Sequence, residues 1–530
     1  MTKVCILAAG EGTRNSLAKF SHKALLPIQG KPIISLIIDC YPKHTHFIIA
    51  IGHNGHLIKD YLKITRPNYK ITFVKIKNLK SKNSGPGETL LQCKKYLKSS
   101  FISHACDTLI DYKFKNKDFG QTNWIGYDNS LENDNYVFVK NTSKKKEIFS
   151  NERNLDKAFI GLAYIKEYEK FWQSLKKINY YSNKFKKKNK SEKQMLDGFY
   201  FLSKLKVKKF RWMDTGNDQA YQKVFKKYSK SRNLILPKQN EHIYIEKKKV
   251  IKFFYDKDIT KKKYNRSKLF DNFLPSSIAI NKNFLSYDYF NGHLLVNEKS
   301  SIRFEKIIDE LFKNFWKKTK LNRIQLNHFY HECNKFYKIK TFDRVDLYLS
   351  KKNTYDRFDY INNLKVSDCF SVLDKINWTE IQIGIPGTFH GDTAPNNIVV
   401  GKNDFKLIDW RESFGSLALH GDLYYDFSKM YHALLISQLA TFSRNFSIIK
   451  KKNNVNFSVK DYRNLKFFRK IFINKVTEYG FDPKKVELLS YLTFLNICPL
   501  HDEDIGNLLF LAGKYYVTKF LENESKYKLN

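Results

Sequence analysis

The chain has 530 residues and a formal net charge of +43 at pH 7. This length exceeds what one hydrophobic core usually supports, so we expect two domains, spanning residues 1–234 and 235–530. The seven cysteines have no Cys-x-x-Cys spacing, which argues against a zinc ribbon or a disulfide framework and is typical of a reducing cytoplasm.

The positive charge by itself would suggest a nucleic-acid partner. Lysine is spread along the whole chain, however, and no nucleic-acid-binding motif occurs. We therefore expect no nucleic-acid partner and interpret the Lys184–Lys193 cluster as a solvated surface loop. The N-terminus has no signal-peptide pattern, and the apolar run Leu488–Leu500 is too short to span a bilayer. We expect a cytoplasmic protein without integral membrane contact.

The chain opens with an apolar run, residues 4–9, which is short enough to be a buried parallel strand. It leads directly into Gly10-Glu11-Gly12-Thr13-Arg14. Glycines placed after a strand let backbone N–H groups approach phosphate oxygens, and a positive side chain then neutralises the charge. We predict that Gly10 and Gly12 bind a nucleotide and that Arg14 supplies this charge. The pattern differs from the dinucleotide fingerprint, which needs a third glycine.

Residues 7–14, together with Lys23-Ala24-Leu25-Leu26-Pro27, closely resemble the nucleotidyltransferase family that makes sugar nucleotides and CDP-choline from a nucleoside triphosphate. The gap of nine residues between Arg14 and Lys23 fits that family, although Ala24 stands where the family commonly has Pro. The resemblance implies that Arg14 and Lys23 stabilise charge on the triphosphate and on an acceptor phosphate.

Three later segments match the same family in the expected order. Residues 84–90 resemble the loop against which the nucleotide base lies, which implies a nucleotide-binding role for Gly85 and Gly87. Residues 102–107 and 212–216 resemble the two segments that present magnesium-binding carboxylates, here Asp107 and Asp214. Two carboxylates suit a reaction in which Mg²⁺ bridges the triphosphate while an acceptor phosphate attacks the α phosphorus. We interpret Cys106, which replaces a more usual Gly, as a tolerated packing residue.

The spacing of apolar segments in the first half is that of alternating strands and helices. Apolar runs occur at residues 47–51 and 71–74, and a helix-like stretch covers residues 33–40. We predict an α/β, Rossmann-like domain with a mainly parallel sheet and a nucleotide at the carboxyl ends of its strands. A short basic helix over residues 219–228 and a polar stretch at 229–233 suggest a connector before residue 235.

The second half contains His-Gly-Asp-Thr-Ala-Pro-Asn-Asn at residues 390–397 and Leu-Ile-Asp-Trp at 407–410. In kinases a catalytic Asp accepts the proton of the substrate hydroxyl, while an Asn five positions later and a second Asp hold magnesium on the ATP phosphates. Asp392, Asn397 and Asp409 have this spacing. Gly391 replaces the Arg of protein kinases, which favours a small-molecule kinase.

Residues 235–530 closely resemble the aminoglycoside phosphotransferase and choline kinase family on these motifs. The resemblance implies an α+β, protein-kinase-like domain that uses ATP, with Lys252 on a strand steadying the ATP phosphates. Two departures stand out. Residues 235–250 contain no glycine for a lid, and the predicted helix at 261–273 offers no Glu to pair with Lys252. An apolar stripe over residues 302–316 predicts a buried helix.

A kinase makes a phosphate monoester, which is the acceptor that a nucleotidyltransferase needs. We therefore predict a bifunctional, Mg²⁺-dependent enzyme that phosphorylates a small alcohol, amino alcohol or sugar with ATP. It then activates the product with CTP, or another nucleoside triphosphate, for capsule, lipopolysaccharide or lipid assembly. Two alternatives remain. The second domain could act on a substrate unrelated to the first reaction, or it could be a pseudokinase that only binds a partner.

Overall fold

The computed structural model describes residues 2–81, 84–120, 122–129, 136–140, 149–150, 157–184, 193–228, 238–351, 355–460 and 463–528. The connector expected at 229–233 and most of the Lys184–Lys193 cluster lie outside these ranges. The chain forms two compact units, residues 1–257 with 279–287, and residues 258–278 with 288–530. The domain boundary expected at residue 235 lies inside the first of these units, and as a statement about domains it stays a prediction.

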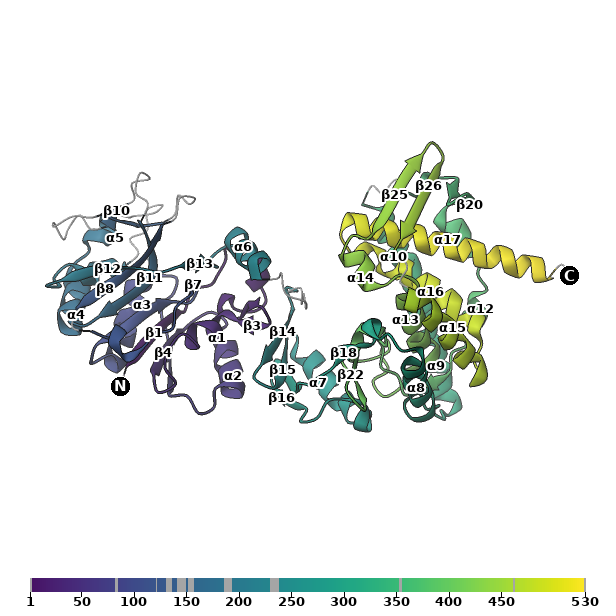
Figure 1. The fold of residues 1–530 in the computed structure, drawn as a ribbon, viewed down its shortest axis with the longest axis horizontal. Coiled ribbons are helices and arrows are strands. Elements are labelled where there is room, and N and C mark those ends of the chain that lie inside the picture. Colours follow the sequence, from purple (N-terminus) through teal and green to yellow (C-terminus); the bar gives the residue numbers. More distant parts are fainter. Residues whose placement is uncertain are drawn as a thin grey trace. The chain divides into compact units, whose positions relative to one another are not determined.

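A single large sheet organises the first unit (Figure 1). Its parallel part has the order β6-β1-β4-β5, as expected for strands joined by helices. These strands are β1 (Lys3–Ala8), β4 (His46–Ile51), β5 (Ile71–Lys75) and β6 (Phe101–Ala105). The remaining strands are β8 (Asn123–Asn129), β9 (Phe138–Val139), β10 (Phe149–Ser150), β11 (Lys157–Ile165) and β12 (Leu205–Lys209). β11 runs antiparallel to β6 and extends the sheet beyond its parallel part. The mainly parallel sheet predicted from the apolar runs is confirmed.

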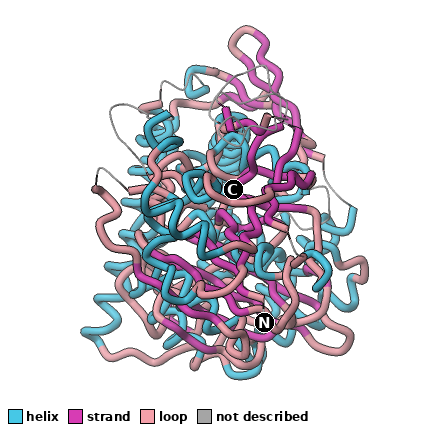
Figure 2. Tube along the Cα trace, turned by 90° about the vertical axis from the view of Figure 1, so that its left-hand side faces the viewer, coloured by secondary structure: helices cyan, strands magenta, loops and turns pink. Residues whose placement is uncertain are grey.

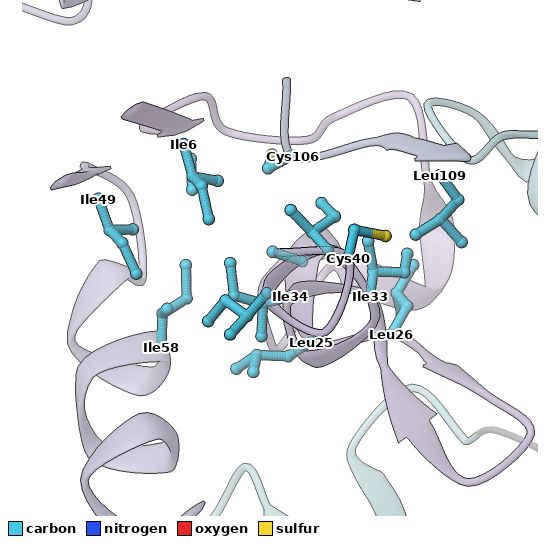
Figure 3. Close-up of a cluster of buried hydrophobic side chains, with 14 of the residues drawn as sticks. Ile6, Leu25, Leu26, Ile33, Ile34, Cys40, Ile49, Ile58, Cys106 and Leu109 are labelled. Atoms are coloured by element: carbon cyan, nitrogen blue, oxygen red, sulfur yellow. The ribbon is translucent and has the colours of Figure 1, made fainter. Parts of the chain in front are cut away.

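Apolar side chains from helices cover both faces of this sheet. The apolar side chains of strand β1 belong alternately to two hydrophobic cores, with Ile6 in one core and Cys5 in the other. In Figure 3, Ile6 and Ile49 of the sheet lie with Ile33, Ile34 and Ile58 of the helices on one face. A parallel sheet that is buried on both faces needs such runs of apolar residues. The helices are α1 (Ile33–Ile38), α2 (Gly55–Thr65), α3 (Pro86–Cys93), α4 (Tyr168–Lys177), α5 (Tyr180–Lys184) and α6 (Asp218–Tyr228).

A second, smaller sheet also belongs to the first unit. Its order is β14-β15-β17-β16, with β14 (Glu241–Glu246), β15 (Lys249–Phe254), β16 (Ala279–Asn281) and β17 (Phe284–Asp288). The Tyr244 hydroxyl donates to the Leu25 carbonyl at 2.7 Å, and Glu246 forms a buried ion pair with Arg66 of the segment after α2. Arg66 also lies 2.8 Å from Asp39. Because buried charges are costly without partners, this network holds the small sheet in one register.

Helices dominate the second unit. Figure 2 shows the helices, strands and loops of the chain in cyan, magenta and pink. The predicted apolar stripe is confirmed, since Ile307, Ile308, Leu311, Phe312, Phe315 and Trp316 are all buried. The helices are α7 (Lys257–Ser267), α8 (Ser301–Glu310), α9 (Arg323–Asn334), α10 (Lys340–Leu349), α11 (Cys369–Asp374), α12 (Trp378–Ile381), α13 (Leu423–Leu435), α14 (Gln438–Phe442), α15 (Arg463–Glu478), α16 (Pro483–Ile497) and α17 (Glu503–Lys528).

Short strands complete the second unit. β22 (Ile398–Val400) pairs with β18 (His293–Leu294) and β23 (Phe405–Leu407), and β21 (Pro386–Gly387) pairs with β24 (Gly421–Asp422). A separate sheet has the order β20 (Leu364–Lys365), β19 (Tyr360–Ile361), β26 (Asn454–Val459) and β25 (Phe446–Lys451). Across the described ranges of the chain, no helix is both long and apolar enough to cross a membrane.

Candidate active sites

The first candidate site lies where β1 and β6 end. These strands are parallel neighbours, with Leu7 opposite Ala105, so the segments that follow them emerge at the same edge of the sheet. Gly12 follows β1 with a φ of +69°, a conformation that glycine adopts without strain. Lys23 Nζ lies 2.7 Å from Asp107 Oδ2 in a partly buried ion pair. The structure thus brings Lys23 and Asp107 into direct contact.

Asp214 reaches the same place from a distant part of the chain. It ends β13 (Trp212–Asp214), which pairs with β7 (Thr108–Ile110) so that Asp214 lies opposite Thr108. Gly216 follows, and the point where its Cβ would lie is 3.1 Å from Asp214 Oδ1, 3.3 Å from Asp107 Oδ2 and 3.8 Å from Arg14 Nη2. Both predicted carboxylates and the predicted arginine therefore converge on one point, which a side chain at position 216 would occupy.

The two carboxylates differ in their electrostatic surroundings. Burial would raise the pKa of Asp107, but Lys23 and then Arg14 hold that pKa below its usual range. Burial raises the pKa of Asp214, and hydrogen bonds from the Tyr136 hydroxyl at 2.8 Å and the Gly216 N–H at 2.9 Å offset this only in part. The nearby charge of Asp107 adds to the increase. A cation placed between the two carboxylates would relieve their mutual repulsion.

The donor set at this point suits Mg²⁺. Magnesium usually takes one or two protein carboxylates and fills its other positions with water and substrate phosphates. Asp107 and Asp214 supply two such groups on one side of Gly216. Within the part of the chain that the structure describes, no cluster of three or more His, Cys, Asp or Glu side chains forms a more complete metal site.

A cavity of about 440 Å³ lies at the carboxyl ends of β1, β4 and β5. Glu11 of the predicted nucleotide loop lines it, together with three cationic or titratable side chains that the sequence analysis did not single out, His53, Lys75 and Lys80. Little in the sequence indicated that these three residues line a cavity, because each only follows or ends an apolar run. Gly52 completes the wall, and a Cβ there would overlap the Ala9 carbonyl.

The predicted base-binding glycines lie at the start of α3. Gly85 immediately precedes the helix, and Gly87 lies in its first turn. A Cβ at Gly87 would come within 2.7 Å of the Gln194 carbonyl oxygen and 2.8 Å of the Lys193 oxygen. Close packing against this backbone therefore requires glycine at position 87, independently of any nucleotide. Gly10 has open space around it.

The second candidate site is built around the loop that carries Asp392. The Asn397 amide donates to Asp392 Oδ2 at 2.8 Å and to the Asp392 carbonyl at 2.9 Å. Lys429 Nζ of α13 lies 2.9 Å from Asp392 Oδ1. Burial would raise the pKa of Asp392, but the Lys429 ammonium holds that pKa below its usual range. The sequence did not indicate Lys429, which reaches the site from a separate helix.

A buried carboxylate accepts hydrogen bonds from the backbone of this loop. Asp426 of α13 accepts hydrogen bonds from the backbone N–H groups of His390 and Gly391, both at 2.6 Å, and from the Trp316 indole at 3.0 Å. Burial raises the pKa of Asp426 to about 6. Gly391 has a φ of +88°, which explains a glycine at this position. Burial lowers the pKa of His390 to about 4, so its ring is neutral at pH 7.

Asp409 lies beside this loop. The Ile408 N–H donates to the Asn397 carbonyl at 2.8 Å, which ties the two predicted motifs together. Asp409 is about one-third exposed and has a φ of +65°. Lys263 of α7 lies 4.0 Å from Asp409 Oδ1 and donates to the Trp410 carbonyl. The helix that lacks the expected Glu thus presents a lysine to this motif.

Lys252 lies on β15 and is almost fully buried. It belongs to the first unit, whereas Asp392, Asn397 and Asp409 belong to the second. Its pairing with ATP phosphates therefore stays a prediction.

The first unit is an α/β domain with a mainly parallel sheet, as predicted. A glycine loop follows its first parallel strand, and a lysine and two carboxylates meet at the carboxyl edge of the sheet. The chain matches no protein-family model.

The chain is similar to curated proteins named bifunctional protein GlmU. The Methanococcus maripaludis protein of strain S2 is 32% identical over 164 residues, which covers 28% of this chain and 37% of that protein. The Pseudomonas aeruginosa PAO1 protein is 30% identical over 104 residues, covering 19% and 20%. The chain thus spans little more than a third of the length of these relatives at most. This similarity supports the predicted nucleotidyltransferase class.

Solved structures with similarity to the chain include a UDP-glucose pyrophosphorylase complexed with UDP-glucose, at 19% identity and a TM-score of 0.36 over 44% of this chain and 100% of the other. They also include the CTP:phosphocholine cytidylyltransferase of Streptococcus pneumoniae, at 19% identity and a TM-score of 0.34 over 42% and 98%.

Proposed function

We propose that the first unit transfers a nucleotidyl group from a nucleoside triphosphate to a phosphate monoester. The observation that carries this proposal is the convergence of Arg14, Asp107 and Asp214 on one point beside Lys23. An acceptor phosphate oxygen forms a bond to the α phosphorus, the bond between the α phosphorus and the α,β-bridging oxygen breaks, and pyrophosphate leaves. CTP is the favoured donor.

In this mechanism the side chains act by position and charge. When the triphosphate enters, the Lys23 ammonium, which Asp107 holds in place, would also bind phosphate oxygens. Arg14, beside Gly216, would neutralise further phosphate charge. Asp107 and Asp214 would hold Mg²⁺, which when bound would neutralise the phosphate oxygens and make the α phosphorus more electrophilic. The glycines at positions 10 and 12 leave room for the phosphates beside the backbone.

The test uses the purified full chain with magnesium and ATP, CTP, UTP or GTP, each against a panel of phosphorylated sugars, alcohols and amino alcohols. Products are identified by mass, and pyrophosphate is measured separately. We expect a nucleoside-diphosphate-linked product with at least one acceptor, and none with Asp107→Ala. Absence of product and of pyrophosphate across the panel would rule the proposal out.

We further propose that the second unit is a small-molecule kinase that supplies this acceptor. The contact between Asn397 and Asp392, with Lys429 on the other carboxylate oxygen, supports it. Asp392 would accept the proton of the acceptor hydroxyl as its oxygen bonds to the γ phosphorus and ADP leaves. Asn397 and Asp409 would hold Mg²⁺ on the ATP phosphates, which magnesium neutralises, and Lys252 would steady those phosphates.

The two reactions would then be consecutive, with products that feed capsule, lipopolysaccharide or lipid assembly in the cytoplasm. An unphosphorylated acceptor should become nucleotide-linked, and Asp392→Asn should block this unless the phosphate is supplied. If Asp392→Asn changes nothing and only preformed phosphates react, the second unit is a binding module. Magnesium-dependent ATP hydrolysis and ATP binding distinguish that pseudokinase alternative directly.

A further inference from the structure

Four cationic side chains near Asp392 are close enough to influence one another electrostatically. They come from three parts of the second unit, namely α10, the segment after Asp409, and α13. All four residues are partly exposed. We refer to Lys340, Arg344, Arg411 and Lys429 as the cationic cluster.

The cluster is attached to the catalytic loop at two points. Lys429 Nζ lies 2.9 Å from Asp392 Oδ1. Arg411 covers Gly391, since a Cβ on that glycine would lie 2.7 Å from both Cβ and Cγ of Arg411. The Arg411 guanidinium also donates to the Tyr425 hydroxyl at 2.9 Å. The cluster therefore adjoins the carboxylate that would receive the acceptor's proton.

An aromatic surface borders the cluster. Lys340 Nζ lies 3.9 Å from the centre of the Phe336 ring, and the Arg411 guanidinium carbon lies 5.6 Å from the same centre. Phe336 is in turn packed against Tyr425, with ring centres 4.8 Å apart. The Phe336 ring thus lies close to two cations of the cluster.

Positive charge dominates around Lys340, whose strongest electrostatic neighbours are Arg411, Lys429 and Arg344. Asp392 pairs with Lys429, and Glu412 acts on Arg411. Burial lowers the pKa of the Lys340 ammonium, and the positive charges of Arg411, Lys429 and Arg344 lower it further, to about 7. Like charges held together in a partly buried site are unfavourable unless a ligand neutralises them. The missing partner of this site is therefore an anion.

We infer that the acceptor of the second unit is an anionic alcohol, with its hydroxyl at Asp392 and a carboxylate or phosphate group on the cationic cluster. This inference rests on the kinase activity proposed above and names its substrate class. A quaternary ammonium or an aminoglycoside-like polycation would meet repulsion from the cluster. The ATP side of the site has its own cation, because Lys263 lies 4.0 Å from Asp409 Oδ1.

The test compares acceptors that differ in charge, using the full chain with magnesium and ATP. The anionic probes are D-glycerate and D-glucuronate, which carry a carboxylate, and sn-glycerol 3-phosphate, which carries a phosphate. The matched uncharged or cationic probes are glycerol, glucose and choline. We expect the KM of the best anionic probe to be at least about tenfold below that of its neutral counterpart, since a charged hydrogen bond is gained. The two anionic arms decide between carboxylate and phosphate.

Charge-removing variants locate the effect. Lys340→Met and Arg344→Met should each raise the KM of the anionic probe about tenfold and leave the KM of ATP and of the neutral probe unchanged. Lys338→Met is the matched control, because Lys338 lies exposed on the same helical segment. A preference for neutral or cationic acceptors overturns the inference while the kinase proposal stands. A rise in the KM of ATP instead also overturns it, because the cluster would then serve the nucleotide.

If no probe is phosphorylated, the kinase proposal fails on its own, and direct binding still decides the anion site. Calorimetry of the full chain with the same three anionic probes should show binding that Lys340→Met weakens about tenfold and Lys338→Met does not. Absence of binding by all three anions overturns the inference.

Discussion

The two candidate sites treat charge in opposite ways. In the first unit Lys23 and Asp107 neutralise each other before any substrate is present, and the second carboxylate, Asp214, lies within reach of both Asp107 and Arg14. In the second unit Lys429 pairs with Asp392, and Lys340 next to it has mainly cations as its electrostatic neighbours. A balanced site suits a ligand that brings its own magnesium, whereas a site with excess positive charge suits a ligand that brings an uncompensated anion.

The largest expected effect is the loss of phosphoryl transfer when Asp392 of the second candidate site is replaced. Asp392→Asn should lower phosphoryl transfer by about 1,000-fold, because a positioned general base contributes about 10²–10⁴-fold. Nucleotidyl transfer to preformed phosphates should be unchanged. Coupled and uncoupled product assays measure both. The control is Asp404→Asn, since Asp404 belongs to the same unit and its side chain is 58% exposed. Loss of both activities would contradict the separation of the two sites.

The next largest expected effect is the loss of nucleotidyl transfer when Asp107 of the first candidate site is replaced. Asp107→Ala removes the partner of Lys23 and one of the two carboxylates beside Gly216. We expect nucleotidyl transfer to fall by about 100-fold or more, the size seen when a preorganised charge is removed from an active site. Kinase activity should persist. Asp111→Ala is the control, because that side chain is 65% exposed. An equal loss in the control would point to general unfolding.

A third prediction concerns stability and tests whether the small sheet belongs to the first unit. Arg66→Met leaves the buried Glu246 carboxylate without its ion-pair partner. Removing one partner of a buried pair costs about 3–5 kcal/mol, so the free energy of unfolding of the first unit should fall by about that amount. Chemical denaturation followed by tryptophan fluorescence measures it. Lys238→Met removes a mostly exposed partner of Glu241 and should change stability little. Similar losses in the two variants would refute the assignment.

The smallest expected effect is a pH dependence of the KM for an anionic acceptor, which only the second site should show. The pKa of Lys340 is lowered to about 7, so its charge is present below that pH and lost above it. A bound anion favours the charged form, so the KM of an anionic acceptor should rise as pH increases from 7 to 9. The total increase should not exceed about tenfold, because full loss of the Lys340 charge should cost no more than Lys340→Met does. Lys340→Met should abolish it. Nucleotidyl transfer measured in parallel should lack this dependence.

Much of the first unit could be predicted from local patterns. The apolar run at residues 4–9 and the glycines that follow it indicated β1 and its loop, and both are where they were expected. The residues 219–228 formed the expected helix, α6, and the stripe from Ile307 to Trp316 is buried. These features depend on short-range periodicity and turn chemistry, which neighbouring residues decide. The spacing of Asp392 and Asn397 is equally local, because both lie within one loop.

The partners of the predicted residues were not predictable in the same way. Lys429 and Arg411 meet Asp392 and Gly391 through the packing of a helix and a later segment onto the loop. The cavity residues His53 and Lys75 depend on which strands adjoin β1. Residues 279–287 lie in the first unit, and no local pattern in the sequence indicated this. Strand pairing and burial made this choice, and neither leaves a pattern within a short window of sequence.

By itself, the sequence determined which chemical groups this protein offers: a glycine loop, a lysine and two carboxylates in one half, and an Asp–Asn–Asp set in the other. Tertiary structure alone decided how these groups are charged and partnered. The pairing of β13 with β7 brings Asp214 beside Asp107, and the packing of α10 and α13 brings Lys340 and Lys429 together near Asp392. The reason is physical, since electrostatic interactions act through space over a few ångströms, whatever the separation along the chain.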